Sequence, residues 1–159
     1  MVRHLVLCSM TLSFALLAAD QYTGPRPPKT DVPYLLQADK LIPTEVVEAT
    51  ESHPKKNQSV FTVPGASSTA KTPLAEPIFI LQSKQVSPQS LLLYRFDVSK
   101  GNRQVVVGKG SDTEGPFHLS VRDLGGGLYQ IEVSDSLENG EYSLSPNGSN
   151  KAFCFSIVD

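Results

Sequence analysis

The sequence predicts an all-β fold, an antiparallel β-sandwich, and three observations point to it. In several stretches of the second half of the chain every second residue is apolar, first from Leu92 to Val98. A period of two is typical of strands with one buried face. The 12 prolines and 11 glycines among 159 residues favour many turns over long helices. No apolar period of 3.6 residues persists beyond residue 19, so we expect no long helix in the remaining chain.

The expected strands follow one another at intervals of about ten residues, which is typical of sandwiches and barrels. The clearest strand candidates are residues 92–98, 104–107, 117–121, 129–133, 142–144 and 153–157. Before them, 60–63 and 78–81 are strand candidates, and 34–47 fits either two short strands around Pro43 or one helical turn. We expect residues 34–159 to form a single sandwich domain, with 78–159 as its best-defined part.

The first 19 residues have the features of a signal peptide. Arg3 and His4 supply a short positive start. Residues 5–19 form an uncharged apolar run, shorter than the roughly 20 residues that a membrane-spanning helix needs. The cleavage site is imperfect, because Leu17 stands where a small residue is preferred. The alternative is an uncleaved N-terminal anchor, which a mature N-terminus found near Asp20 would exclude.

Residues 20–33 contain four prolines, so we expect a Pro-rich extended arm between the signal peptide and the domain. Cleavage after residue 19 removes one basic residue and no acidic residue, so the net charge moves from −2 to −3. This mild charge does not favour a nucleic acid or an anionic membrane as partner. Cleavage also removes Cys8 and leaves Cys154 alone, which excludes an intramolecular disulfide. Cys154 has apolar neighbours, which favours a buried role.

One local pattern bears on the type of sandwich. The stretch 138–144, Glu-Asn-Gly-Glu-Tyr-Ser-Leu, resembles the corner before the sixth strand of immunoglobulin-like domains, where a tyrosine hydroxyl binds the backbone. Leu144 stands where that family has a cysteine, and the family's buried tryptophan is missing. The resemblance implies an immunoglobulin-like sandwich with Tyr142 facing inward. The alternative is a two-residue hairpin turn at Asn139-Gly140, which also places Tyr142 inward.

The C-terminal half also resembles short exported bacterial β-sandwich proteins of uncharacterised function. The resemblance rests on Gly-x-Tyr-x-Leu-Ser-Pro at 140–146 and Phe-x-Phe at 153–155. It implies secretion or a periplasmic location, and it implies no particular activity.

No motif of the chain supports catalysis, a metal or a cofactor. His53 and His118 lie far apart in the sequence and, with one cysteine, make no zinc spacing. Residues 112–114, Asp-Thr-Glu, lack the further ligands of a calcium loop. Residues 108–111, Gly-Lys-Gly-Ser, lack the glycine spacing of a phosphate-binding loop. We therefore expect no catalytic residue, no metal ligand and no cofactor.

One enzymatic alternative rests on three acidic residues, Asp135, Glu138 and Glu141. A pair of carboxyl groups about 5 to 9 Å apart serves glycoside hydrolysis, so a small extracytoplasmic hydrolase would use this acidic corner. A further alternative is a membrane-tethered envelope protein that keeps residues 5–19.

Our main expectation is an exported binding or structural module without catalysis, whose partner is a protein or a component of the cell envelope. Recognition would use an exposed sheet edge or the loops at one end of the sandwich. The expected contact loops are 66–72 and 109–116. We expect no nucleic acid partner, and no membrane span after cleavage of the signal.

Overall fold

A computed structural model of the chain describes residues 21–110 and 115–159. These residues form thirteen strands and one short 3-10 helix, η1 (Pro88–Ser90), so the predicted all-β fold is confirmed. The strands, in chain order, are β1 (Tyr34–Gln37), β2 (Lys40–Pro43), β3 (Glu45–Glu48), β4 (Thr50–Ser52), β5 (Gln58–Pro64), β6 (Lys71–Thr72), β7 (Ile78–Gln82), β8 (Leu91–Ser99), β9 (Asn102–Gly108), β10 (Leu119–Gly125), β11 (Leu128–Val133), β12 (Gly140–Pro146) and β13 (Lys151–Ile157). Within the described ranges, no helix is long and apolar enough to cross a membrane.

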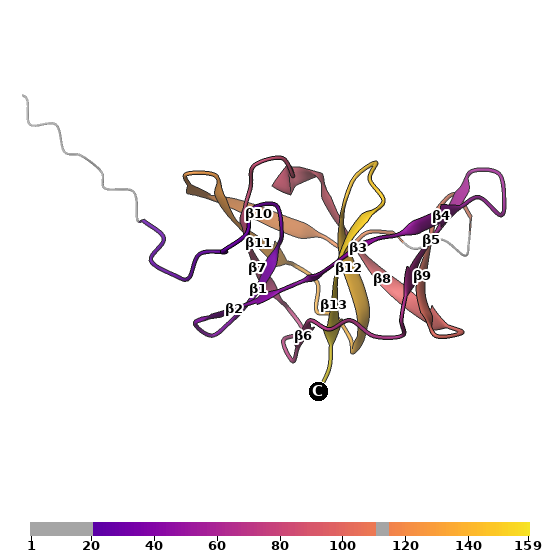
Figure 1. The fold of residues 1–159 in the computed structure, drawn as a ribbon, viewed down its shortest axis with the longest axis horizontal. Helices are drawn as coiled ribbons and strands as arrows, with labels where there is room; N and C mark the ends of the chain where they lie inside the picture. Colours follow the sequence, from indigo (N-terminus) through magenta and orange to yellow (C-terminus); the bar gives the residue numbers. More distant parts are fainter. Residues whose placement is uncertain (1–20, 111–114) are drawn as a thin grey trace, which may run out of the picture.

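The strands form two sheets. One has five strands in the order β10-β11-β7-β1-β2, and the other has eight, with the main path β3-β13-β12-β8-β9-β5-β4. The remaining strand of the larger sheet is β6, which pairs in parallel with β13. The other strand pairings in both sheets are antiparallel. In Figure 1 the five-stranded sheet lies at the left, β4, β5 and β9 lie at the right, and β12 and β13 lie between them.

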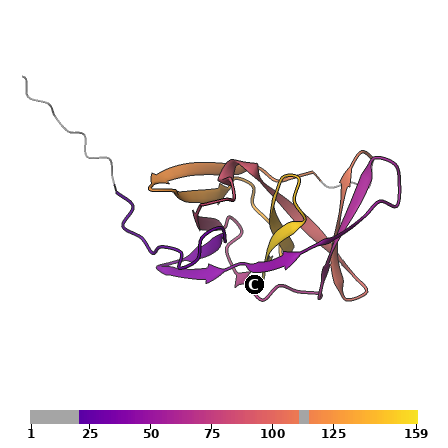
Figure 2. The ribbon, with the colours of Figure 1, turned by 45° about the horizontal axis from the view of Figure 1, so that its top comes forward.

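Residues 34–64 belong to both sheets. β1 and β2 extend the five-stranded sheet next to β7, β3 pairs with β13, and β5 pairs with β9. Figure 2 shows this segment crossing the molecule from one side to the other. The stretch 34–47 is therefore extended, with no helical turn. The polar stretch after it also contains strand β4, which the sequence pattern did not predict because all three of its residues are exposed.

The first hydrophobic core lies between the two sheets. It combines Phe79 and Ile131 of the five-stranded sheet with Tyr142, Phe153 and Phe155 of the eight-stranded sheet, all fully or almost fully buried. The rings of Phe79 and Phe155 meet edge to face at 5.1 Å between centroids. This core makes the molecule a sandwich, as the alternation predicted.

A second hydrophobic core lies on the other side of the eight-stranded sheet. The two ends of that sheet, β3 and β4, are neighbours in the chain and flank Ala49, so the sheet curls into a nearly closed barrel. The barrel interior is filled by Val63, Phe96, Val105, Ala152 and Cys154, together with partly buried side chains around them. The molecule is thus a sandwich and a barrel that share strands.

The shared strands correct one sequence expectation. An every-other-residue pattern predicted one buried and one solvent-exposed face, but β12 and β13 are buried on both faces over most of their length. Along β12, Tyr142 and Leu144 face the sandwich, while Glu141 and Ser143 lie on the barrel side. The polar residues that alternate along β12 therefore do not mark a solvent-exposed face. They mark the interior of the barrel.

The corner before β12 distinguishes the two alternatives for residues 138–144. β11 ends at Val133 in the five-stranded sheet and β12 begins at Gly140 in the other sheet, so Asn139-Gly140 joins no hairpin and that alternative is wrong. The hydroxyl of Tyr142 donates a hydrogen bond to the carbonyl oxygen of Glu138 at 2.8 Å. The ring of Tyr142 stacks on Phe155, with 5.6 Å between centroids. Tyr142 therefore fixes the crossing between the sheets.

Replacement of Tyr142 tests this corner. Tyr142→Phe removes only the hydroxyl bond and should cost about 1 kcal/mol of unfolding free energy. Tyr142→Ala also removes the buried ring and should cost roughly 3 kcal/mol or more. Urea unfolding followed by circular dichroism measures both values. Tyr129→Phe, on β11, is the matched control and should leave stability nearly unchanged. Equal stability of Tyr142→Ala and the unmodified protein would place Tyr142 outside the core.

Candidate functional site

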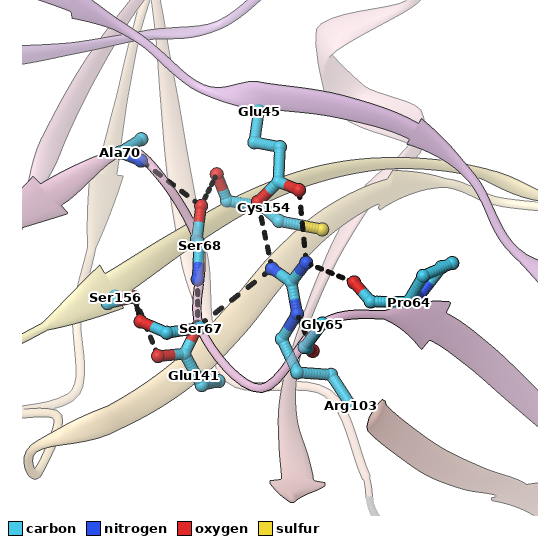
Figure 3. Close-up of polar contacts among 10 residues, drawn as sticks. All are labelled: Glu45, Pro64, Gly65, Ser67, Ser68, Ala70, Arg103, Glu141, Cys154 and Ser156. Carbon is cyan, nitrogen blue, oxygen red and sulfur yellow. Dashed lines mark hydrogen bonds and ion pairs between the residues drawn. The ribbon is translucent and has the colours of Figure 1, made fainter. Parts of the chain in front are cut away.

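The most concentrated group of buried polar side chains surrounds Arg103 at one end of the barrel (Figure 3). Arg103 comes from β9 and is only 1% exposed. Its Nη1 and Nη2 donate to the two carboxylate oxygens of Glu45 on β3 at 2.9 and 3.0 Å. Its Nε donates to the carbonyl oxygen of Gly65 at 3.0 Å, and Nη2 also donates to that of Pro64 at 2.9 Å. The guanidinium thus ties β3 and the end of β5 to β9.

Glu141 on β12 is the second carboxyl group of this cluster. One of its oxygens accepts a hydrogen bond from the Ser156 hydroxyl at 2.7 Å, and the other accepts one from the backbone N–H of Ser68 at 2.8 Å. Nη1 of Arg103 lies 3.9 Å from that second oxygen, so Glu141 completes an ion-pair network with Arg103. The Ser68 hydroxyl donates to the carbonyl oxygen of Cys154 at 3.1 Å. These bonds fasten the loop before β6 to β12 and β13.

The electrostatics of the cluster follow from burial and pairing. Burial by itself would raise the pKa of Glu45, but hydrogen bonds from Arg103 and Ser68 and the positive charge of Arg103 outweigh it and lower the pKa. For Arg103 the directions are reversed: burial by itself would lower the pKa, but the hydrogen bonds to Glu45 raise it. Burial raises the pKa of the neighbouring Cys154 thiol to about 12, although Arg103 acts in the opposite direction. The thiol therefore stays protonated near neutral pH and is a poor nucleophile.

This polar cluster is a structural element. A buried charge is tolerated when its hydrogen-bonding capacity is met, and Nε, Nη1 and Nη2 of Arg103 all have protein partners. In the part of the chain that the structure describes, no buried side-chain nitrogen or oxygen lacks a hydrogen-bond partner. The cluster thus presents no unpaired group to a substrate.

The acidic corner expected from the sequence does not form one site. Glu138 is 80% exposed and pairs with Arg95 at 2.9 Å, outside the barrel. Asp135 accepts a hydrogen bond from the backbone N–H of His118 at 2.8 Å. Glu141 points inward to the cluster around Arg103. These three carboxyl groups bond to different partners and do not face one another. The geometry therefore gives no support to a hydrolase at this corner.

The remaining sequence candidates lie apart from one another. The side chain of His118 is 86% exposed, and His53 lies in a loop where its Nδ1 is 3.1 Å from the Ser59 hydroxyl. Among the described residues, no three His, Cys, Asp or Glu side chains come together as a metal site. Residues 112–114, the weak calcium-loop candidate, lie outside the described residues.

The two expected contact loops differ in how far the structure describes them. Within loop 66–72, Ser68, Ala70 and Thr72 are buried, and Ser68 is part of the cluster around Arg103, so much of this loop is committed to the fold. Loop 109–116 is described only at its ends, outside 111–114.

A cavity of about 110 Å³ opens at the other end of the barrel. Its walls come from three strands that carry apolar or aromatic side chains at alternate positions: Phe61, Leu92, Tyr94, Phe96, Val105 and Val107. Ser143 and Ser145 add hydroxyl groups, and the turn 146–150 between β12 and β13 forms the rim. Small-molecule sites often occupy the mouths of barrels, so this cavity is the candidate binding site.

Strand register explains why the cluster and the cavity lie at opposite ends. On β9, Arg103 is followed on the same face by Val105 and Val107. The neighbouring strand β5 places Val63 beside Arg103 and Phe61 beside Val105. β8 places Phe96 beside Glu141, and Tyr94 beside Ser143. From the Arg103 end of the barrel to the other end, the inward-facing side chains are therefore first charged and then apolar, and the last of them border the open mouth.

Sequence reasoning missed both Arg103 and the cavity. Arg103 and Glu45 are 58 positions apart, and nothing local to either residue signals the pair. The signal for a second core was present in the continuous apolar runs of β8 and β13, since strands buried on both faces lose their alternation.

Comparison of the chain with protein-family models, with curated protein sequences and with solved structures finds no match. The functional conclusion therefore rests on the residues and on the geometry described above.

The lowered pKa of Glu45 predicts a pH dependence of stability. A carboxyl group with a lower pKa in the folded state stabilises that state above its unfolded pKa, about 4.3 for glutamate, and this stabilisation is lost as the pH falls through the folded value. Glu45→Gln should therefore lose on the order of 2 kcal/mol near pH 7 and show a flatter decline of stability on acidification.

Urea unfolding between neutral and acidic pH measures both effects. Glu48→Gln is the matched control, since Glu48 is exposed on the same strand, and it should behave like the unmodified protein. The assignment of Glu45 fails if Glu45→Gln and Glu48→Gln have the same stability at every pH.

Proposed function

We propose that this chain is a non-catalytic binding module and that the mouth of its barrel is the binding site. The observation that carries the proposal is the cavity of about 110 Å³ with aromatic and aliphatic walls and a rim of serine and asparagine residues. A preformed cleft with mostly apolar walls and a few polar groups is the usual form of a small-ligand site.

The composition of the lining supports binding over catalysis. Among the described residues, no Asp, Glu, His, Lys, Arg or Cys side chain lines the cavity, and Tyr94 is the one titratable residue of its lining. General acid–base and nucleophilic catalysis both require such groups within reach of the substrate. The buried charged residues Arg103 and Glu141 lie at the closed end of the barrel, where they belong to one ion-pair network.

The size of the cavity limits what it takes. An apolar protein cavity of about 150 Å³ accommodates benzene. The present cavity is somewhat smaller but open at its mouth, so a single ring or a branched alkyl group would enter it with part of the ligand at the rim. This group would belong to a small molecule or to a short extension of a larger envelope component.

Strand order supports an immunoglobulin-like arrangement for the sandwich portion. The order β10-β11-β7-β1 parallels the D-E-B-A sheet of such domains, and β13-β12-β8-β9 parallels their G-F-C-C′ sheet. The hydrogen bond from Tyr142 to Glu138 lies at the start of the strand that corresponds to F, where the family has its tyrosine corner. β4 and β5 are the additions that close the barrel.

Export remains part of the proposal on the strength of residues 1–19, which lie outside the described residues. A signal peptide would deliver the module to the periplasm or the medium, where the ligand or envelope partner would be met. The resemblance to exported bacterial β-proteins supports the same location.

Titration of the purified protein with toluene tests the site. We expect saturable shifts of backbone amide signals in β8, β9 and the turn 146–150, observed by ¹⁵N–¹H NMR. Val107→Phe fills the cavity and should abolish these shifts. Val98→Phe is the matched control, because Val98 lies on β8 but is exposed, and it should bind like the unmodified protein. Absence of saturable shifts in the unmodified protein with toluene, and also with its polar analogues phenol and benzoate, would overturn the proposal.

A further inference from the structure

We infer that the barrel mouth selects a neutral ring that carries a single hydroxyl group, with phenols as the simplest class, over hydrocarbons and over anions. This inference rests on the proposed function and specifies the ligand of the same site. It follows from three features of the cavity in the part of the chain that the structure describes: lining residues without charge, one hydroxyl without a protein partner, and a ring-sized apolar interior.

The absence of charge acts against ionic ligands. Within residues 21–110 and 115–159, the residues that line the cavity carry no formal charge. Arg103, the buried cation of the barrel, lies at the closed end, where its Nε, Nη1 and Nη2 donate to Glu45, Gly65 and Pro64. A carboxylate that entered the apolar interior would therefore lose water without gaining a counter-charge from a lining residue, which is costly.

Tyr94 supplies the polar preference. It lines the cavity on β8, and its hydroxyl makes no hydrogen bond within the described residues. Burial raises the pKa of Tyr94, so the hydroxyl stays protonated and can both donate and accept. A hydrocarbon that covered this hydroxyl would leave it without water and without a partner, which costs binding free energy. A ligand hydroxyl would provide the missing partner.

The neighbouring serines complete the polar side of the site. The hydroxyls of Ser143 and Ser145 lie 3.3 Å apart and bond to each other. Strand register places Ser143 directly beside Tyr94 on the adjacent strand. Because each serine oxygen keeps further acceptor capacity, either serine can accept a hydrogen bond from a ligand hydroxyl. The opposite wall, formed by Phe61, Val105 and Val107, would contact the ring.

Toluene, phenol and benzoate are suitable probes, since toluene and phenol have nearly the same shape and benzoate carries a charge. Each would be titrated into the purified protein and followed by amide shifts of β8, β9 and the turn 146–150. We expect toluene and phenol to bind at these residues and benzoate to bind at least roughly ten-fold more weakly than phenol. Tyr94→Phe should lower the ratio of phenol affinity to toluene affinity by roughly three- to ten-fold.

Tyr129→Phe is the matched control and should leave this ratio unchanged, because Tyr129 lies on β11 and does not line the cavity. An unchanged ratio in Tyr94→Phe, or benzoate affinity equal to that of phenol, would overturn the inference while the proposed function stands. If toluene, phenol and benzoate all fail to bind, the proposed function falls and this inference falls with it.

Discussion

The two-sided burial of β12 and β13 is the constraint on which the remaining structure depends. Alternate residues of these strands point into two different hydrophobic cores, so Tyr142 and Phe155 pack in the sandwich while Cys154 lies in the barrel. β8 does the same with Leu93 and Phe96. A change of register by one residue would exchange the two sets of side chains and damage both cores, so the pairing of these strands is strongly specified.

The barrel has one closed end and one open end because of what the shared strands carry there. At the closed end, Glu141 and Ser156 meet Arg103, whose bonds to Glu45 hold β3 against the barrel. Loss of one partner would leave buried charge uncompensated, which makes this end intolerant of substitution. At the open end, the same face of β12 carries only Ser143 and Ser145, and the cavity remains. A hydrogen-bonded cluster at one end of the barrel and an open cavity at the other are thus built from the same strands.

The sequence predicted the sheets of the second half because their side chains keep a period of two and their turns contain Gly, Asn and Pro. It also identified Tyr142 as inward, but not whether Asn139-Gly140 makes a hairpin, since both alternatives share the same local residues. The first half was harder, because strands such as β4 are short, exposed and held by partners far away in the sequence. The barrel was not predicted for a related reason. In the sequence, Glu141, Ser143 and Ser145 have the pattern of a solvent-exposed face, and only the curvature of the sheet places them inside the barrel.

Native-state hydrogen exchange, measured amide by amide with increasing denaturant, tests the shared layer most directly. If β8, β12 and β13 serve both cores, their amides should exchange slowest, and they should exchange only through the global unfolding that also exposes β5, β9 and β11. Exchange of β12 and β13 at a lower free energy than either flanking set of strands would contradict a common layer. Two separate unfolding transitions, one for the sandwich and one for the barrel, would contradict it as well.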